Sequence, residues 1–363
     1  MALFSKLPSG GGLSKTKVIT TYDIKKTAAY GDMIDELITD YGGRPKGAIY
    51  HEEYDTYTKL YVLGYSSNKF QIKTFTIDST GISEGESVVI SGADVNSNFA
   101  LKGDKHSNVI VMYVSNTSSS TIYCINKETL AVTTISSPTY NNTRLSFGGA
   151  SIRDGIIYAG ISCNLMQPCV YKYDESGSII GYIENKCNIL YCNTAPQLDA
   201  DGNIYITCTG NGTSSTTIAS LTNDGEVRWY KSMDDLRITE SLMLLAVADD
   251  GSVLCKPRTT MTALFRLDSN GNTIGQSNFF TTIGVSTFAV KYLNNLGLVQ
   301  IQDIDGKYCY LCDSDFSKLE SFTITNTDGI PVVAFLADKI AVVRFDGTLR
   351  VETRKPYVEY LKR

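Results

Sequence analysis

Short apolar runs, each closed by a polar turn-forming residue, recur along most of the chain. Examples are Phe75-Thr76-Ile77-Asp78 and Phe265-Arg266-Leu267-Asp268, and the turn-forming residue falls at positions 78, 126, 174, 222, 268 and 313. The intervals between these positions are 48, 48, 48, 46 and 45 residues. Short runs rich in β-branched and aromatic residues predict strands, and a fixed period of about 20–50 residues predicts a repeat architecture.

A second marker keeps step with the first and lies earlier in each unit. It reads Asp154-Gly155, Asp201-Gly202 and Asp250-Gly251, with weaker copies at Asn294-Asn295 and Asp338-Lys339, and an apolar run follows each copy. Such pairs supply the positive φ angles of tight hairpins. Together the two markers predict a unit of four strands, which in the third unit are residues 149–152, 156–162, 169–173 and 178–183.

A single sheet of four short strands cannot bury both of its faces, whereas radial packing of such sheets covers them. The sequence therefore predicts an all-β fold, a β-propeller of about seven four-stranded blades with a 45–48-residue repeat, over residues 44–363. The seventh unit, from Pro331, lacks an outer strand. We expect the β-rich segment 17–23 to complete it and to close the ring.

The segments outside the repeat are expected to carry attachment functions. Residues 27–41 place apolar side chains, including Met33 and Leu37, at helical spacing, so residues 17–43 should hold the closing strand and one amphipathic helix. The helix would either plug the propeller or dock a partner. Residues 1–16 are expected to form a flexible arm whose Leu3, Phe4 and Leu7 anchor the protein in a neighbouring subunit.

Composition narrows the function classes. The formal charge of −5 and the absence of any Lys/Arg block argue against nucleic-acid binding. The N-terminus lacks the apolar core of a signal peptide, and no run approaches the ~18 apolar residues of a membrane-spanning helix. The nine cysteines are expected to be buried reduced thiols. Cys309 and Cys312 have CxxC spacing, but on a strand they would point to opposite faces.

Residues capable of catalysis or ligand binding are few. The two histidines, His51 and His106, fall in different units and in no recognised catalytic motif, so we expect no catalytic residues and no cofactor. The acidic turns 199–203 and 303–306 resemble the start of calcium loops but lack the later acidic ligand. They are expected to be structural turns, with bound Ca²⁺ as the alternative. Most of the 23 tyrosines should pack between blades, whereas Tyr140 and Tyr191, expected in loops, could stack on sugars.

Two resemblances extend this picture. Residues 219–229, with Asp224, Gly225 and then Trp229, resemble the quinoprotein-like propeller repeat, although Trp229 is the only tryptophan. This resemblance implies the fold and no quinone chemistry. Residues 1–12 look like the openings of some phage and prophage tail proteins of Gram-positive bacteria. That resemblance implies a virion component of a tail or baseplate, assembled in the host cytoplasm, with other virion proteins and a host cell-surface glycan or protein as partners.

Three functions remain open at this point. The first is a non-enzymatic structural or receptor-binding propeller of a phage-tail-like particle. The second is a lectin-like glycan-binding module. The third is a hydrolase or lyase acting on a cell-surface polysaccharide, which would require a deep central pocket with two close carboxylates.

Overall fold

The computed structural model describes residues 22–29, 48–66, 69–92, 98–115, 120–162, 168–184, 189–192, 195–210, 216–232, 234–238, 242–257, 263–277, 288–293, 298–303, 308–312, 318–323, 332–336, 339–343 and 348–354. Within these ranges the regular structure is β, apart from one 3₁₀ turn at Asp234–Leu236. None of the helical structure in these ranges is long and apolar enough to cross a membrane.

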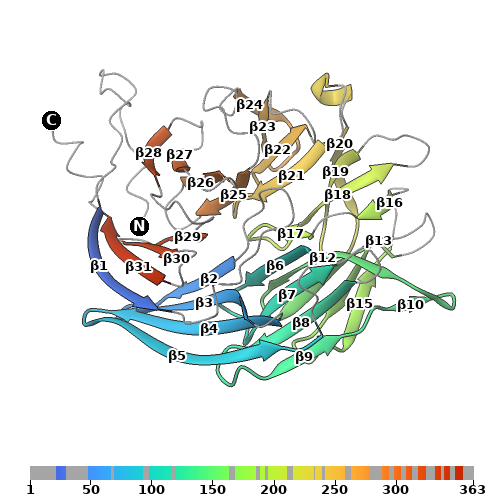
Figure 1. Ribbon diagram of the computed structural model, residues 1–363. Helices are drawn as coiled ribbons and strands as arrows, with labels where there is room; N and C mark the ends of the chain where they lie inside the picture. The colour runs from blue at the N-terminus through green and yellow to red at the C-terminus, as the bar shows by residue number, and fades with distance from the viewer. Residues whose placement is uncertain are drawn as a thin grey trace, which may run out of the picture.

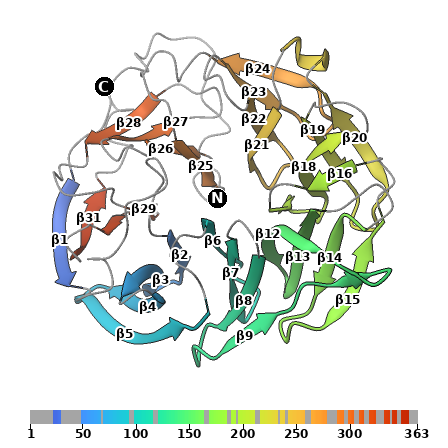
Figure 2. The ribbon, with the colours of Figure 1, turned by 45° about the vertical axis from the view of Figure 1, so that its right-hand side comes forward.

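Seven antiparallel sheets are arranged as the blades of a ring, which confirms the predicted propeller (Figures 1 and 2). We name the strands of each blade A to D from the centre outward. The first four blades comprise β2 (Ala48–Glu53), β3 (Tyr57–Ser66), β4 (Lys69–Asp78) and β5 (Gly81–Ile90); β6 (Asn98–Gly103), β7 (Val109–Ser115), β8 (Ser120–Asn126) and β9 (Val132–Ile135); β12 (Ser146–Arg153), β13 (Ile156–Ser162), β14 (Val170–Tyr173) and β15 (Ile179–Ile183); and β16 (Ile189–Cys192) with β17 (Gln197–Leu198), β18 (Ile204–Gly210), β19 (Thr216–Leu221) and β20 (Val227–Lys231).

The remaining strands complete blades 5 to 7 and one hairpin. They are β21 (Leu242–Val247), β22 (Val253–Pro257), β23 (Leu264–Leu267) and β24 (Thr273–Ser277); β25 (Phe288–Leu293), β26 (Leu298–Asp303), β27 (Tyr308–Cys312) and β28 (Lys318–Thr323); β29 (Val332–Phe335), β30 (Lys339–Val343), β31 (Thr348–Arg354) and β1 (Tyr22–Ala29); and the hairpin β10 (Thr139–Tyr140) with β11 (Thr143–Arg144). The strands expected in the third unit correspond to β12–β15 within a few residues.

The first sequence marker forms the turn between strands C and D. In blade 3, Asp174 Oδ1 accepts hydrogen bonds from the backbone N–H groups of Ser176 and Ser178, both at 2.9 Å. In blade 5, Asp268 Oδ1 accepts from the N–H groups of Asn270 and Asn272. A side chain that caps its own turn in this way explains why Asp or Asn recurs at this position.

The second marker forms the turn between strands A and B. Asp154 and Gly155 have φ angles of 49° and 74°, and Gly202 and Gly251 have φ angles of 77° and 79°. Glycine adopts this left-handed region without steric cost. Because the strands are antiparallel, the A–B and C–D turns lie at the same end of every blade. We call this side of the ring the turn face.

A strand from the N-terminal segment closes the ring, as expected, and it extends further along the chain than expected. β1 pairs antiparallel with β31, from Tyr22 opposite Arg354 to Ala29 opposite Thr348. The described closing strand thus shares residues 22–23 with the expected segment 17–23 and continues to Ala29, whereas residues 17–21 lie outside the described ranges. The predicted start of the helix at Thr27 is wrong, because residues 27–29 belong to β1, where pairing with an open sheet edge outweighs a weak local helical pattern. Residues 30–41 lie outside the described ranges.

The hydrophobic core lies between the blades. One buried cluster joins Leu60 of blade 1, Met112 of blade 2 and Val351 of blade 7, and another joins Val111 of blade 2, Ile157 of blade 3 and Ile206 of blade 4.

Polar contacts across the blade interfaces recur with the repeat. In three interfaces the backbone oxygen of the residue after the first marker accepts hydrogen bonds from the preceding blade. The pairs are Lys59 and Tyr61 to Lys127 O, Lys172 to Asn223 O, and Arg228 and Trp229 to Ser269 O. The C–D turn thus links each of these blades to the one before it.

Candidate functional site

Several residues that the sequence singled out lie outside the described ranges. They are the docking candidates Leu3, Phe4, Leu7, Met33 and Leu37. Their role stays a prediction.

The two tyrosines expected in loops both lie in strands, so that expectation was wrong. Tyr140 lies in β10 and is half-buried against the core, where the left-handed turn residues Asn141 and Asn142 close a hairpin. Tyr191 lies in β16, opposite Thr209. The innermost strand of blade 4 is divided there into β16 and β17, which both pair with β18. Sugar stacking by either residue is untested.

The carboxylate of Asp199, in the acidic turn 199–203, is held by internal donors. Asp199 is 2% exposed, and its Oδ1 accepts from the N–H groups of Asp201 and Asn203. Its Oδ2 accepts from the Asn203 amide at 2.9 Å and the Tyr205 hydroxyl at 2.8 Å, and Arg228 lies 3.9 Å away. Burial and the bond to Asp199 raise the pKa of Tyr205 to about 12, so it remains a donor. These contacts give Asp199 a structural role. Within the described ranges no group of three His, Cys, Asp or Glu residues could hold a metal ion.

Two of the buried cysteines, Cys124 and Cys255, are poor nucleophiles. Cys124 and Cys255 are buried, and burial raises the pKa of each thiol to about 12. Both thiols therefore stay protonated at neutral pH. Since the thiolate is the reactive form, neither is a good nucleophile. The two histidines lie in different blades, His51 in β2 and His106 in the A–B turn of blade 2, and His51 Nε2 lies 3.7 Å from Glu53 Oε1.

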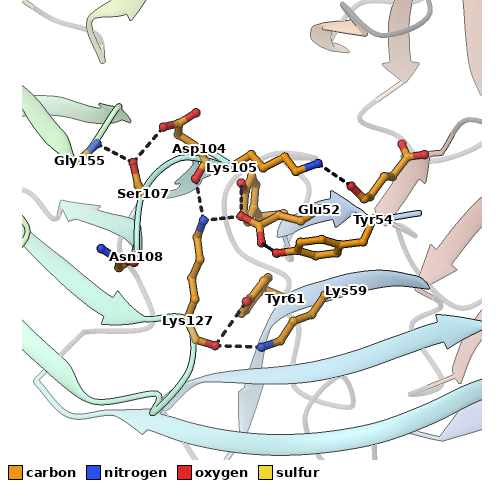
Figure 3. Close-up of polar contacts among 12 residues, drawn as sticks. Glu52, Tyr54, Lys59, Tyr61, Asp104, Lys105, Ser107, Asn108, Lys127 and Gly155 are labelled. Atoms are coloured by element: carbon orange, nitrogen blue, oxygen red, sulfur yellow. Dashed lines mark hydrogen bonds and ion pairs between the residues drawn. The ribbon is translucent and has the colours of Figure 1, made fainter. Parts of the chain in front are cut away.

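A cluster of charged and aromatic side chains lies on the turn face between blades 1 and 2 (Figure 3). Its centre is an ion pair between Glu52, the last residue but one of β2, which is 4% exposed, and Lys127, which begins the C–D turn of blade 2 and is 9% exposed. Glu52 also accepts hydrogen bonds from the hydroxyls of Tyr50 at 2.8 Å and Tyr54 at 2.7 Å. Lys127 also donates to the backbone oxygen of Asp104 at 2.6 Å.

The hydroxyl protons of this cluster are firmly held. Burial, with the nearby charge of Glu52, raises the pKa of Tyr50 far above its ordinary value, and the hydrogen bond to Glu52 raises that of Tyr54 to about 12. Each Glu52 oxygen already has a donor, and the carboxylate is almost fully buried. This arrangement suits a clamp between blades rather than a group that reacts with a substrate.

The same clamp continues into blade 3. Asp104 Oδ2 accepts hydrogen bonds from the Ser107 hydroxyl and from the N–H of Asp154, and Ser107 Oγ accepts from the N–H of Gly155. The A–B turns of blades 2 and 3 are therefore tied together on the turn face (Figure 3). Sequence reasoning missed the clamp because Lys127 lies 75 residues from Glu52 and 23 residues from Asp104.

An apolar stripe covers the outer rim of blades 3 and 4. Large side chains on strand D of these blades are exposed by 53% at Ile179, Ile180 and Tyr182, by 38% at Val227 and by 66% at Tyr230. The strands β15 and β20 follow one another along the rim in Figure 2. Ile180 has no paired residue in β14, because the register shifts there; such a bulge turns neighbouring side chains outward. We call these five residues the rim stripe.

The repeat itself shows that the fold does not require an apolar residue at this place. One position of strand D can be compared in six blades through the strand pairing. It is the residue paired with the strand-C residue that lies three positions before the first marker. In chain order it reads Glu84, Thr134, Tyr182, Tyr230, Gln276 and Ser321. Blades 3 and 4 alone among these six carry an aromatic residue there, and it is exposed in both. The consecutive isoleucines 179 and 180 were the available sequence signal, since a half-buried strand normally alternates.

Comparisons with known proteins identify the fold. No protein-family model matches the chain, and no curated protein matches it. A catalytically inactive variant of virginiamycin B lyase from Staphylococcus aureus, solved with quinupristin, aligns with a TM-score of 0.57 at 13% identity, over 92% of this chain and 99% of that chain. A streptogramin B lyase aligns with a TM-score of 0.55 at 13% identity, over 91% of this chain and 98% of that one. BamB from Moraxella catarrhalis gives a TM-score of 0.47 at 10% identity, over 92% of this chain and 100% of that one.

At such identities the likeness to the two lyases establishes a β-propeller and nothing about activity. It agrees with the seven blade sheets of the described ranges.

Proposed function

We propose that this chain is a non-enzymatic binding propeller that holds another protein by the outer rim of blades 3 and 4. The observation that supports this is the rim stripe, whose two exposed tyrosines occupy a position that is Thr134 in blade 2 and Gln276 in blade 5. A cluster of exposed apolar side chains of this kind is usually a protein interaction site, because leaving it in water is unfavourable. Tyrosine is also enriched at such sites.

The finer proposal is a structural or receptor-binding component of a phage tail or baseplate. Its support is the resemblance of residues 1–12 to the openings of tail proteins, together with a rim suited to protein contacts. Co-sedimentation of the chain with tail-sized particles from its source would support this version. A chain found only as a small species there would contradict it, without affecting the proposal of a binding rim.

The experiment for the binding function compares matched variants of the full chain. Tyr182→Ser combined with Tyr230→Ser removes the aromatic part of the stripe, whereas Gln276→Ser changes the equivalent exposed position in blade 5. After affinity purification and quantitative mass spectrometry, we expect defined partners with wild type and with Gln276→Ser, and their loss with the double variant. Equal recovery of all partners by the three proteins would refute a role for the rim.

Glycan binding is a second candidate, favoured by a different observation. Tyr54 and Tyr57 are exposed by 39% and 38% on the turn face, and their rings stack with centroids 4.6 Å apart. Aromatic faces of this kind stack on sugar rings. Glycan-array binding that is lost in Tyr57→Ala would support this function, and an array without signal would remove it.

A further inference from the structure

The rim stripe fits a short peptide better than a second folded protein. It comprises five side chains, each about half exposed, and so offers at most a few hundred Å² of apolar surface. A stable contact between two globular surfaces needs about 800 Å² from each partner. A peptide with two or three apolar anchors would match the smaller area.

The chain itself contains such a peptide before β1. Residues 1–21 include the closely spaced Leu3, Phe4 and Leu7, and three lysines at positions 6, 15 and 17, with no acidic residue. Among the described residues at the strand ends beside the stripe, three exposed ones are carboxylates. Glu184 follows β15, and Asp224 and Glu226 precede β20. The nearby cations Lys172, Arg228 and Lys231 are only half exposed, and the first two donate to blade interfaces.

Distance decides whether the peptide could reach the stripe of its own chain. β1 is the outermost strand of blade 7 and lies across the ring from β15 and β20 (Figure 2). Leu7 precedes Tyr22 by 15 residues, which span at most about 54 Å when fully extended. A compact chain of this length has a radius of gyration of about 21 Å, so the path half way round its surface is on the order of 80 Å. Along the rim the peptide therefore cannot reach its own stripe, and over the face of the ring it would have to be almost fully extended, which favours the stripe of a second copy.

We propose that residues 1–21 of one copy bind the rim stripe of a second copy, with Leu3, Phe4 and Leu7 on the apolar side chains and the lysines towards the flanking carboxylates. This inference rests on the proposed binding function of the rim and names its occupant. β1, which the donating segment precedes in the chain, and the accepting surface lie on opposite sides of the ring. The contact is therefore heterologous, and it adds copies head to tail.

The test uses two variants of the full chain that each lack one half of the contact. The first lacks residues 1–16 and retains β1, so that blade 7 stays closed. The second carries Tyr182→Ser and Tyr230→Ser. By sedimentation velocity over a range of concentrations, wild type and the control Gln276→Ser should form a concentration-dependent series of oligomers. Each defective variant alone should be monomeric.

Mixing the two variants gives the decisive result. The second variant still has its N-terminal segment and the first still has its stripe, so the mixture should form heterodimers and no larger species. A fluorescent peptide of residues 1–21 should bind the first variant in anisotropy measurements, at least tenfold more tightly than it binds the same protein with Tyr182→Ser and Tyr230→Ser. Absence of both heterodimers and peptide binding would overturn the inference. If partners are still lost from the rim variant in the purification experiment, the binding function itself would stand.

Discussion

The buried ion pair between Glu52 and Lys127 gives the most quantitative test of how blades 1 and 2 are held together. Removing one member of a buried pair typically costs about 3–5 kcal/mol, because an uncompensated charge stays buried. The loss in the free energy of unfolding caused by Glu52→Leu should lie in this range. It leaves Lys127 with only the backbone oxygen of Asp104 and deprives the hydroxyls of Tyr50 and Tyr54 of their acceptor.

Lys127→Met should cost less, about 1–3 kcal/mol, since the carboxylate of Glu52 keeps both tyrosine donors. The methionine also retains most of the packing of the lysine stem. Combining the two substitutions should recover part of the loss from Glu52→Leu, because no buried charge remains. The control is Lys73→Met, which removes the ion pair with the half-exposed Glu84 and should cost at most about 1 kcal/mol.

Urea unfolding followed by the fluorescence of Trp229 measures these differences, provided that the dependence on urea concentration keeps the same slope. Trp229 lies between blades 4 and 5, distant from the substitutions, and so reports on the unfolding of the whole ring. A larger cost for Lys127→Met than for Glu52→Leu would refute the reasoning. So would a double variant whose cost equals the sum of the two single ones.

Three further predictions concern turns and closure. Gly271→Ala should lower the melting temperature more than Gly202→Ala does. Both glycines have φ near 80°, but a Cβ at 271 would lie 2.7 Å from the Trp229 ring, whereas Gly202 faces open space. Equal shifts in thermal unfolding would contradict this reasoning. Deletion of residues 1–29 should lower the melting temperature markedly, because β31 loses its outer neighbour β1. Deletion of residues 1–16 should leave the melting temperature unchanged. The Ser176 hydroxyl, with nearby backbone N–H groups, lowers the pKa of Asp174. The stabilisation by its carboxylate is therefore present above the unfolded pKa of about 3.9 and is lost as the pH falls through the lower folded value. The melting temperature of Asp174→Asn should accordingly lie below that of wild type at pH 7 and converge with it in acid. A difference that stays constant with pH would refute this link.

Local chemistry explains which parts of the fold the sequence predicts. Asp174 and Asp268 cap their own turns, and Gly155 adopts the left-handed conformation, so the repeat is visible residue by residue. Contacts between distant residues are not visible in this way. Nothing near Lys127 in the chain indicates that Glu52 is its partner, and the helical spacing after Thr27 does not reveal that β31 offers an open edge.

The rim stripe was missed for a related reason. Tyr171 and Tyr182 look alike in the sequence, yet Tyr171 is 5% exposed and Tyr182 53%. What distinguishes them is their distance from the ring centre, because strand C is covered by neighbouring blades and strand D forms the rim. Aligning the repeats through their registers, rather than inspecting any one strand, separates the two cases.

The contacts of the C–D turns of blades 2, 4 and 5 with the preceding blades have a consequence for how such a ring can change over evolution. Five residues separate strands C and D in each of blades 2 to 6, whereas the connection between strands B and C varies from two residues, 67–68, to seven, 163–169. An insertion in a C–D turn would displace the backbone oxygen that the neighbouring blade holds. Insertions on the opposite side leave these C–D-turn bonds in place. New loops, and with them new specificities, can therefore be acquired on that side while the ring itself stays unchanged.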